Sequence, residues 1–371
     1  MAEAFAYLHQ KGKPTIMTDL KVNKPNPFLA LKDVTIYNRG EDIKNIINVL
    51  EAGSPVLITE FYNNGSVLLN GLQEHLTRTL PNTSFKEQRA FRAVYHKLSN
   101  LIIVEIENHK IVAKKAPVIG WLKKLYPETS DFLLTLPQVQ GLNSAWQWYI
   151  NGISIPGLRN KIHPYYGTYF PTRFEHLELF DNWLKRYGGP KKTAVDVGVG
   201  SGVLALQMIK HGFQKVFATD TNPNAIIGLA EMMRDTKLSR KIELDFGSLF
   251  GKWKNKTELI VFNPPWLAET RDSNNLDEAI YYNDPLFSNF FEAAKEMLLP
   301  DGKLVLIFSN LAEITGFSKL NPIEREIAVG GRFQLEKCYT KNVKKASNKT
   351  TRDSHYRKTE EVQLWVLTHV K

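Results

Sequence analysis

The sequence lacks the features that mark secreted, disulfide-stapled and membrane-spanning proteins. A single cysteine, Cys338, occurs in 371 residues, so no disulfide can form within the chain, and a reducing cytoplasm is the expected compartment. No apolar run approaches the roughly 18 residues that a membrane span needs. Residues 1–20 show no leader pattern of basic, apolar and small residues. We therefore expect a cytoplasmic protein that makes no membrane contact.

Metal-ligand and nucleophile motifs are also missing. The nine histidines are scattered, and no pair of them has metal-ligand spacing, so the sequence predicts no metal site. Ser201 does not lie in the G-x-S-x-G context of a nucleophile elbow. These absences argue against a zinc enzyme and against a serine hydrolase.

The composition is that of a globular protein with two domains. Hydrophobic residues make up 43% of the chain and charged residues 23%. At roughly 100–200 residues per domain, the length predicts two domains. We place them at 1–155, a mixed α and β domain that selects the substrate, and at 156–371, a catalytic domain. In the first domain, Asn63-Asn64-Gly65 predicts a turn between two elements.

Positive charge exceeds negative charge, with 48 Lys and Arg against 38 Asp and Glu. A net charge of +10 favours polyanionic partners such as RNA or DNA. Residues 341–358 hold seven basic residues and one acidic residue, a net charge of +6. Such a run fits a solvated loop or a phosphate-contacting element, and the sequence leaves both open. The basic residues are Lys341, Lys344, Lys345, Lys349, Arg352, Arg357 and Lys358.

From about residue 190, short apolar strands alternate with helical patterns. Predicted strands lie at 193–197, 216–219, 242–244, 259–262 and 304–308, with predicted helices at 203–211, 223–236 and 285–298. This alternation predicts an α/β fold with a doubly wound, Rossmann-like parallel sheet. Such a sheet binds its ligand at the carboxyl ends of the strands. Two further strands, near 332–339 and 361–369, predict a terminal hairpin.

The first strand of this region ends in a glycine-rich turn. Asp196 is followed by Gly198, Gly200 and Gly202, and glycine lets a backbone turn tightly and approach a ligand closely. The dinucleotide fingerprint needs a small residue where Val203 stands, so the spacing disfavours NAD. A carboxylate at Asp196 can face the positive amino group of an amino-acid-like ligand.

A second acidic residue ends the second strand. Asp220 lies 24 residues after Asp196, where an acid can accept hydrogen bonds from both ribose hydroxyls of a nucleotide. Both NAD and S-adenosylmethionine contain that ribose. Either acid alone also fits a solvated or capping carboxylate. Together with the glycines and the order of the strands, they predict a nucleotide-like cofactor.

The fourth strand runs into Asn263-Pro264-Pro265-Trp266. Two consecutive prolines cannot continue a strand, so the chain turns at the edge that holds the ligand. An ordinary strand-ending turn explains these residue types too. A planar NH₂ group is a poor nucleophile because its lone pair is delocalised. An Asn carbonyl and a backbone carbonyl can each accept one of its N–H bonds and aim that lone pair, while an aromatic face stacks on it.

These motifs resemble those of class I S-adenosylmethionine-dependent methyltransferases that modify amino nitrogens. The turn at 196–202 is similar to their first motif, and Asp220 falls where their ribose-binding acid falls. Residues 260–266 are similar to the signature of N6-adenine methyltransferases and of HemK-type protein-glutamine methyltransferases. Residues 170–175 resemble the segment that HemK-type enzymes place ahead of the first motif. The resemblance covers about 165–310 and implies S-adenosylmethionine as the cofactor.

The resemblance also implies roles for single residues. Ser248 stands where the family has an acidic residue for the adenine amine, and Trp266 stands where HemK-type enzymes have Tyr or Phe. The implied cofactor contacts are Asp196, Gly198, Gly200, Gly202, Asp220, Ser248 and Thr172. The implied catalytic residues are Asn263, Pro264, Pro265 and Trp266. The expected substrate contacts are Phe170 and Arg173, in the segment 170–175, and Tyr169, directly before it.

The sequence therefore predicts an S-adenosylmethionine-dependent N-methyltransferase. Its acceptor is a planar amino or amide nitrogen of a macromolecule, either adenine N6 of a nucleic acid or glutamine N5 of a protein. Three alternatives stay open at this point: a small-molecule acceptor, an NAD-dependent oxidoreductase, and a catalytically inactive nucleic-acid-binding protein.

Overall fold

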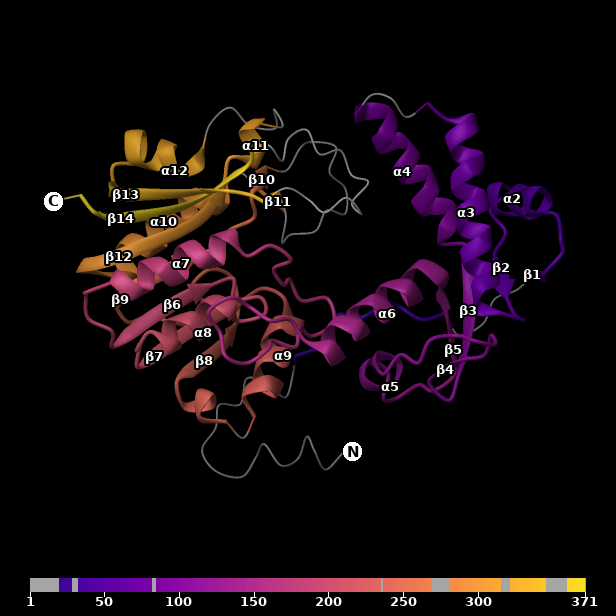
Figure 1. Ribbon diagram of the computed structural model, residues 1–371, viewed down its shortest axis with the longest axis horizontal. Coiled ribbons are helices and arrows are strands. Elements are labelled where there is room, and N and C mark those ends of the chain that lie inside the picture. The colour runs from indigo at the N-terminus through magenta and orange to yellow at the C-terminus, as the bar shows by residue number, and fades with distance from the viewer. Residues whose placement is uncertain are drawn as a thin grey trace. The chain divides into compact units, whose positions relative to one another are not determined.

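The computed structural model describes residues 20–28, 33–81, 85–234, 236–268, 281–283, 285–314, 321–344 and 359–370 (Figure 1). The chain divides into two compact units, and the division falls between Asn151 and Gly152, where a long helix ends. The smaller unit begins at Asn23. The sequence placed the boundary after residue 155. No helix within the described residues is long and apolar enough to cross a membrane.

The N-terminal unit is built on a five-stranded mixed sheet. The strands are β1 (Thr35–Tyr37), β2 (Val56–Ile58), β3 (Ile102–Glu107), β4 (Lys110–Ile111) and β5 (Phe132–Thr135). β1, β2 and β3 are parallel, and β4 and β5 pair with β3 in the antiparallel sense. The helices are α2 (Ile43–Glu51), α3 (Tyr62–Thr79), α4 (Phe85–Ser99), α5 (Trp121–Leu125) and α6 (Leu136–Asn151).

One local prediction in this unit is wrong. Asn63-Asn64-Gly65 lies inside the first turns of α3 and does not form a turn between elements. Asn64 and Gly65 are buried, and a Cβ on Gly65 would lie 2.5 Å from Leu136 Cδ2. Gly65 therefore permits close packing of α3 against the start of α6, a contact between residues far apart in the sequence.

The C-terminal unit contains a seven-stranded sheet in the order β13-β14-β12-β9-β6-β7-β8. The strands are β6 (Thr193–Val197), β7 (Lys215–Asp220), β8 (Ile242–Phe246), β9 (Thr257–Phe262), β12 (Leu298–Ser309), β13 (Phe333–Asn342) and β14 (Glu361–His369). β6, β7, β8, β9 and β12 are parallel. β13 and β14 form an antiparallel hairpin on β12. The predicted doubly wound α/β fold is confirmed.

Helices cover both faces of this sheet. The helices are α7 (Glu175–Arg186), α8 (Val203–Lys210), α9 (Pro223–Met233), α10 (Pro285–Met297), α11 (Leu311–Ile314) and α12 (Pro322–Arg325). A 3₁₀ turn, η3 (Lys237–Arg240), a π turn, η4 (Glu326–Gly330), and a strand pair, β10 (Leu267–Ala268) with β11 (Tyr281–Tyr282), complete the unit.

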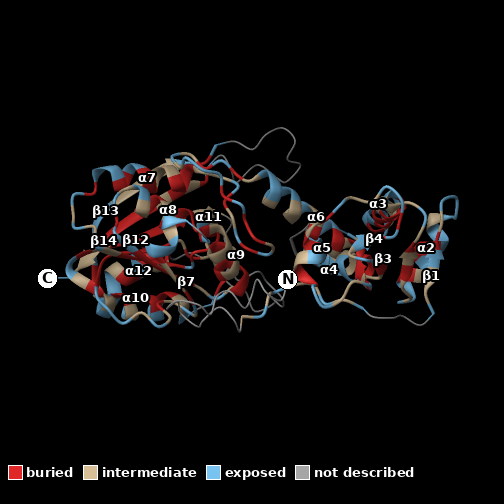
Figure 2. Ribbon diagram, turned by 90° about the horizontal axis from the view of Figure 1, so that it is seen from below, coloured by how far each residue is buried: buried red, intermediate tan, exposed pale blue. Residues whose placement is uncertain are grey.

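The core of this unit lies in two layers, one on each face of the sheet. Along β12, Val305 and Ile307 face the layer beneath α7, α8 and α9, whereas Leu304 and Leu306 face the layer beneath α10. This alternation follows from the two-residue period of a strand. Buried residues accordingly concentrate in the strands and on the inward sides of the helices (Figure 2).

Candidate active site

The glycine-rich turn leaves the end of β6 with three residues in the left-handed region. The φ angles are +69° at Gly198, +49° at Gly200 and +82° at Gly202, where L side chains are strained. A Cβ on Gly202 would also lie 2.4 Å from Leu229 Cδ2 of α9. Space and backbone conformation therefore both require glycine at Gly202, the N-cap residue immediately before α8.

Asp196 is a buried carboxylate without a counter-charge. Its exposed fraction is 0%, and neither of its oxygens has a hydrogen-bond partner within the described part of the chain. Burial raises the pKa of Asp196 to about 8; the backbone amide of Ala205 opposes the shift, and the nearby Asp220 charge adds a smaller upward effect. A cation bound beside it would stabilise the ionised form. This orphaned carboxylate fits the predicted contact with a positively charged amino group.

Asp220 ends β7 and holds the glycine-rich turn in place. Its Oδ2 accepts a hydrogen bond from Gly200 N, and its Oδ1 accepts one from Asn222 N, both at 2.8 Å. Burial raises the pKa of Asp220, although these backbone amides oppose the shift. A carboxylate offers about four lone-pair sites, so about two stay available for ribose hydroxyls. Sequence reasoning did not foresee its bond to Gly200.

The third strand of this unit, β8, carries its acidic residue at Asp245, whereas the family resemblance led us to compare position 248, where this chain has Ser. Ser248 is exposed, whereas Asp245, three residues earlier in β8, is buried. Asp245 Oδ2 accepts a hydrogen bond from Lys252 N at 2.7 Å, and a Cβ on Gly251 would lie 2.2 Å from that oxygen. Asp245 therefore holds its own loop together, and Ser248 is the exposed polar side chain at this strand end.

Asn263 leaves β9 beside the glycine-rich turn. Phe262 of β9 is in register with Val197 of β6, so the next residues, Asn263 and Gly198, emerge at the same edge of the sheet. Val197 is in turn in register with Thr219, the residue before Asp220. The two acids, the glycines and the Asn263–Trp266 segment therefore converge at the carboxyl ends of three neighbouring strands.

Trp266 fixes the side chain of Asn263. Its indole Nε1–H donates a hydrogen bond to Asn263 Oδ1 at 3.1 Å. An indole N–H can only donate, so this bond orients the amide oxygen of Asn263 toward the ring edge. Pro264 between them is buried, while Asn263, Pro265 and Trp266 are half-buried.

His176 is a neighbour of this segment that sequence reasoning missed. It lies in the first turn of α7, is 3% exposed, and meets the Trp266 ring edge to face at a centroid distance of 5.8 Å. Burial lowers the pKa of His176 to about 4, so the imidazole is neutral near pH 7. No motif in the sequence identifies this residue, because its contact with Trp266 joins segments 90 residues apart.

The segment ahead of α7, residues 163–174, lies against the glycine-rich turn, and we call it the covering segment. A Cβ on Gly200 would lie 3.2 Å from the Tyr169 backbone oxygen. Tyr169 is 44% exposed, Phe170 packs against the core, and Thr172 is exposed. Arg173 does not project freely toward this edge, because its Nη1 bonds both carboxylate oxygens of the buried Glu360, at 2.9 and 2.7 Å.

The basic loop 341–358 is described only at its beginning. Lys341 forms an ion pair with Glu178, and Lys344 N donates a hydrogen bond to Glu175 Oε1 at 3.2 Å. These contacts attach the end of β13 to the first turn of α7. Residues 345–358, which carry the other basic side chains of the predicted phosphate contact, lie outside the described residues.

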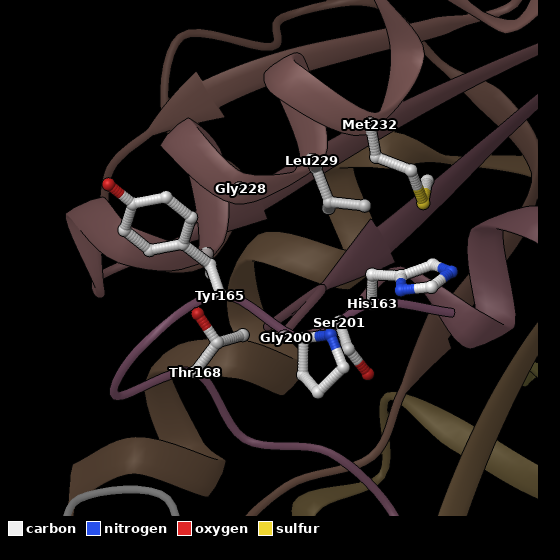
Figure 3. A pocket seen from close by; sticks show the side chains of 10 residues that line it. His163, Tyr165, Thr168, Gly200, Ser201, Gly228, Leu229 and Met232 are labelled. Atoms are coloured by element: carbon white, nitrogen blue, oxygen red, sulfur yellow. The ribbon is translucent and has the colours of Figure 1, made fainter. Parts of the chain in front are cut away.

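A small cavity lies on the α9 side of the turn (Figure 3). Leu229 and Met232 of α9 line one side of it, and His163 and Thr168 of the covering segment line the other. The buried Thr168 Oγ1 has no hydrogen-bond partner among the described residues. Asp196, Asp220 and Asn263 do not line this cavity, but Gly200 and Ser201 of the glycine-rich turn do, so the cavity lies against the turn itself. The described residues contain no group of three or more His, Cys, Asp or Glu able to hold a metal ion.

Comparison with known proteins identifies residues 178–320 as matching the methyltransferase small domain. A protein of Methanocaldococcus jannaschii named as a protein N5-glutamine methyltransferase is 23% identical over 193 residues, covering 49% of this chain and 92% of that protein. The tRNA1(Val) (adenine(37)-N6)-methyltransferase of Cytophaga hutchinsonii is 24% identical, covering 38% of this chain and 60% of that protein. A solved ribosomal protein L11 methylase of Lactobacillus delbrueckii has a TM-score of 0.38 at 19% identity, covering 59% and 91%.

The domain match confirms the resemblance stated from the sequence. Residues 178–320 match the methyltransferase small domain, and the chain is an S-adenosylmethionine-dependent methyltransferase. The match begins within α7 and does not include the N-terminal unit. The domain match therefore supports S-adenosylmethionine as the cofactor and methyl transfer as the reaction, but it says nothing about the N-terminal unit.

Proposed function

We propose that this methyltransferase transfers a methyl group to a planar amino or amide nitrogen of a macromolecule, adenine N6 or glutamine N5. The observation that carries the proposal is the position of Asn263. Asn263 directly follows β9, the strand next to β6, which ends in the glycine-rich turn. Its amide oxygen is fixed by the bond from Trp266. The N5-glutamine and adenine-N6 names of two relatives describe acceptors of this chemical type.

The residues at the sheet edge fit S-adenosylmethionine. Asp196 would face its amino group, because that buried carboxylate has no other counter-charge among the described residues. The remaining lone pairs of Asp220 would accept the ribose hydroxyls, and Gly198, Gly200 and Gly202 would allow close backbone approach. Ser248 and Thr172 are exposed polar groups that would complete the contacts. When bound, the cofactor supplies an electrophilic methyl group on a sulfonium.

Asn263 Oδ1 and the Pro264 carbonyl would each accept one N–H bond from the acceptor. These bonds orient the nitrogen lone pair, and the Trp266 ring face would stack on the planar group. With the cofactor bound, a nitrogen–carbon bond would form as a carbon–sulfur bond breaks, and the nitrogen would then release a proton to solvent. The bond from Trp266 keeps the oxygen of Asn263 in place, which prevents its NH₂ group from facing the acceptor.

The covering segment and the N-terminal unit would select the acceptor. Tyr169 and Phe170 lie on the segment that crosses the glycine-rich turn, so they would border the acceptor. Arg173 would act chiefly through its bonds to Glu360, which attach that segment to the start of β14. The N-terminal unit lies outside the catalytic domain match and would supply a separate binding surface.

Methyl-labelled S-adenosylmethionine tests the proposal. The purified chain is incubated with separate RNA, DNA and protein fractions, and we expect label in one macromolecular fraction. Asn263→Ala should reduce that label by a factor of about 10²–10³, the range for loss of one preorganised polar contact. Asn45→Ala, an exposed asparagine of α2, is the matched control. Absence of label from every macromolecular fraction would contradict the proposal.

A further inference from the structure

We propose that the N-terminal unit carries a nucleic-acid docking surface, formed by exposed lysines on β4, after β4 and on α5. The proposal rests on the proposed function, because it identifies nucleic acid as the macromolecule that is methylated. We define the lysine surface by four residues, Lys110, Lys114, Lys115 and Lys123.

Positive charge in this unit is concentrated in one part of the chain. Residues 85–124 contain nine Lys and Arg and three Asp and Glu, a net charge of +6. The rest of the unit, residues 23–84 and 125–151, contains five basic and eight acidic residues, a net charge of −3. The unit is therefore strongly asymmetric, and its positive part consists of α4, β3, β4 and α5.

The four lysines are exposed and have no acidic partner. Each has an exposed side chain, and none forms an ion pair with any residue in the described ranges. Two lysines of the C-terminal unit, Lys210 and Lys341, show the contrasting case, since they pair with Asp181 and Glu178. Glu107 is the cross-strand neighbour of Lys110 but forms no ion pair with it, so four ammonium groups on one section of the chain give a net positive potential that attracts anions.

Two of the lysines are held over one aromatic ring. The ammonium groups of Lys114 and Lys115 lie 5.9 and 5.7 Å from the centroid of Phe61. In an extended chain, the side chains of consecutive residues point to opposite sides. The φ of Lys115 is +57°, which departs from extended geometry, so the side chains of Lys114 and Lys115 can both reach the ring of Phe61. Backbone bonds fix the position, because Lys114 N donates to Glu60 O and Tyr62 N donates to Lys114 O.

Both ammonium groups therefore lie within 6 Å of one ring centroid, and neither forms an ion pair with a carboxylate in the described ranges. Like charges repel, so an anion bound near both ammonium groups would offset that repulsion. The other two lysines are Lys110, the first residue of β4, and Lys123 of α5. His109 Nε2 lies 2.8 Å from Tyr126 O, which joins the residue before Lys110 to the residue after α5. Figures 1 and 2 both show α5 near β4.

A nucleic acid fits this surface better than a membrane or a phosphopeptide. Membrane-surface binding uses a basic helix with a broad apolar face, and α5 has only five residues, three of them buried. Phosphopeptide sites use clustered arginines with bidentate geometry, whereas these four residues are lysines, which act as point charges. Regularly spaced phosphates along a backbone need only such point charges.

Salt-dependent binding of the full-length chain to a tRNA pool tests the proposal. Anisotropy titrations at several salt concentrations compare wild type with a variant in which Lys110, Lys114, Lys115 and Lys123 become Ser. Each lysine should contribute about 0.7–0.9 to the slope of log affinity against log salt, so the slope should fall by about 3. Arg at all four positions should restore it. The control changes Lys192, Lys237, Arg240 and Lys241 to Ser. These are four exposed residues of the C-terminal unit, one directly before β6 and three in or directly after η3.

The control slope should fall by less than about 1 unit. Equal effects of the two variants, or no salt-dependent binding by wild type, would overturn the proposal, as would an equal loss of binding to phosphatidylserine vesicles. S-adenosylmethionine affinity, measured in parallel, should stay unchanged in the lysine variant. If the wild-type protein transfers labelled methyl groups to the protein fraction, nucleic acid is not the methylated macromolecule. The docking proposal is then refuted, and the proposed methyltransferase function stands. Intact tRNA binding without methyl transfer to any fraction would contradict the proposed function alone.

Discussion

Cofactor binding should depend steeply on pH because of Asp196. The pKa of this buried carboxyl is raised to about 8, chiefly by burial, so its proton is retained near pH 7. A cationic amino group should bind beside the ionised form, whereas the protonated form offers no counter-charge. Binding should therefore release a proton, and affinity should rise as the pH rises toward about 8.

The magnitude follows from the ionised fraction. With a pKa of about 8, about one-tenth of the cofactor-free protein is ionised at pH 7 and about one-hundredth at pH 6. Apparent affinity scales with the competent fraction, so it should weaken about fivefold from pH 8 to pH 7 and about tenfold for each pH unit below about 7. The α-amino group of the ligand, with an ordinary pKa of about 8, stays mostly protonated at and below about pH 7.

Isothermal titration calorimetry with S-adenosylmethionine measures both quantities. Titrations in two buffers of different ionisation enthalpy should give nearly one proton released per binding event near pH 7. Asp196→Asn should bind more weakly and lose the pH dependence, because Asn does not titrate. Asp42→Asn, at the exposed N-cap of α2, should keep the wild-type profile. Flat affinity without proton release in wild type would refute the role of Asp196.

Three further substitutions test the other contacts. Asp220→Ala should weaken cofactor affinity by about 1.5–3 kcal/mol, as expected for lost charge-assisted hydrogen bonds. It should also lower the melting temperature, because Gly200 N and Asn222 N lose their acceptor; an unchanged melting temperature would contradict that contact. Trp266→Phe keeps an aromatic ring but removes the hydrogen bond to Asn263. Turnover should therefore fall about 2- to 12-fold, equivalent to about 0.5–1.5 kcal/mol, while calorimetry should show unchanged cofactor affinity. Arg173→Met should destabilise the protein in urea unfolding by about 1–3 kcal/mol, because Glu360 stays buried without a partner, and adding Glu360→Gln should recover stability; a double variant as unstable as the single one would argue against the pair.

The order of the elements in the C-terminal unit and the glycine-rich turn could be predicted because their causes are local. Alternating strands and helices specify the sheet, and Gly198, Gly200 and Gly202 satisfy a backbone requirement that is visible in the sequence. Val203 correctly argued against a dinucleotide, because the chain carries a methyltransferase domain. These features depend on neighbouring residues, so a sequence pattern can report them.

Contacts between distant segments could not be predicted. The edge contact of His176 with Trp266 and the bonds of Arg173 to Glu360 depend on how α7 packs beside β9 and β14. The sequence likewise predicted a turn at Asn63-Asn64-Gly65, where packing against Leu136 favours helix. Tertiary packing overrode local preference in that segment.

The position of the transferred methyl group tests the central claim most directly. The labelled macromolecule from the wild-type reaction is digested to nucleosides or amino acids, and mass spectrometry locates the added methyl group. We predict that it lies on an exocyclic amino nitrogen or a side-chain amide nitrogen, and that Asn263→Ala removes it while cofactor binding persists. A methyl group on carbon, on oxygen or on a ring nitrogen would contradict the account of Asn263 and Trp266.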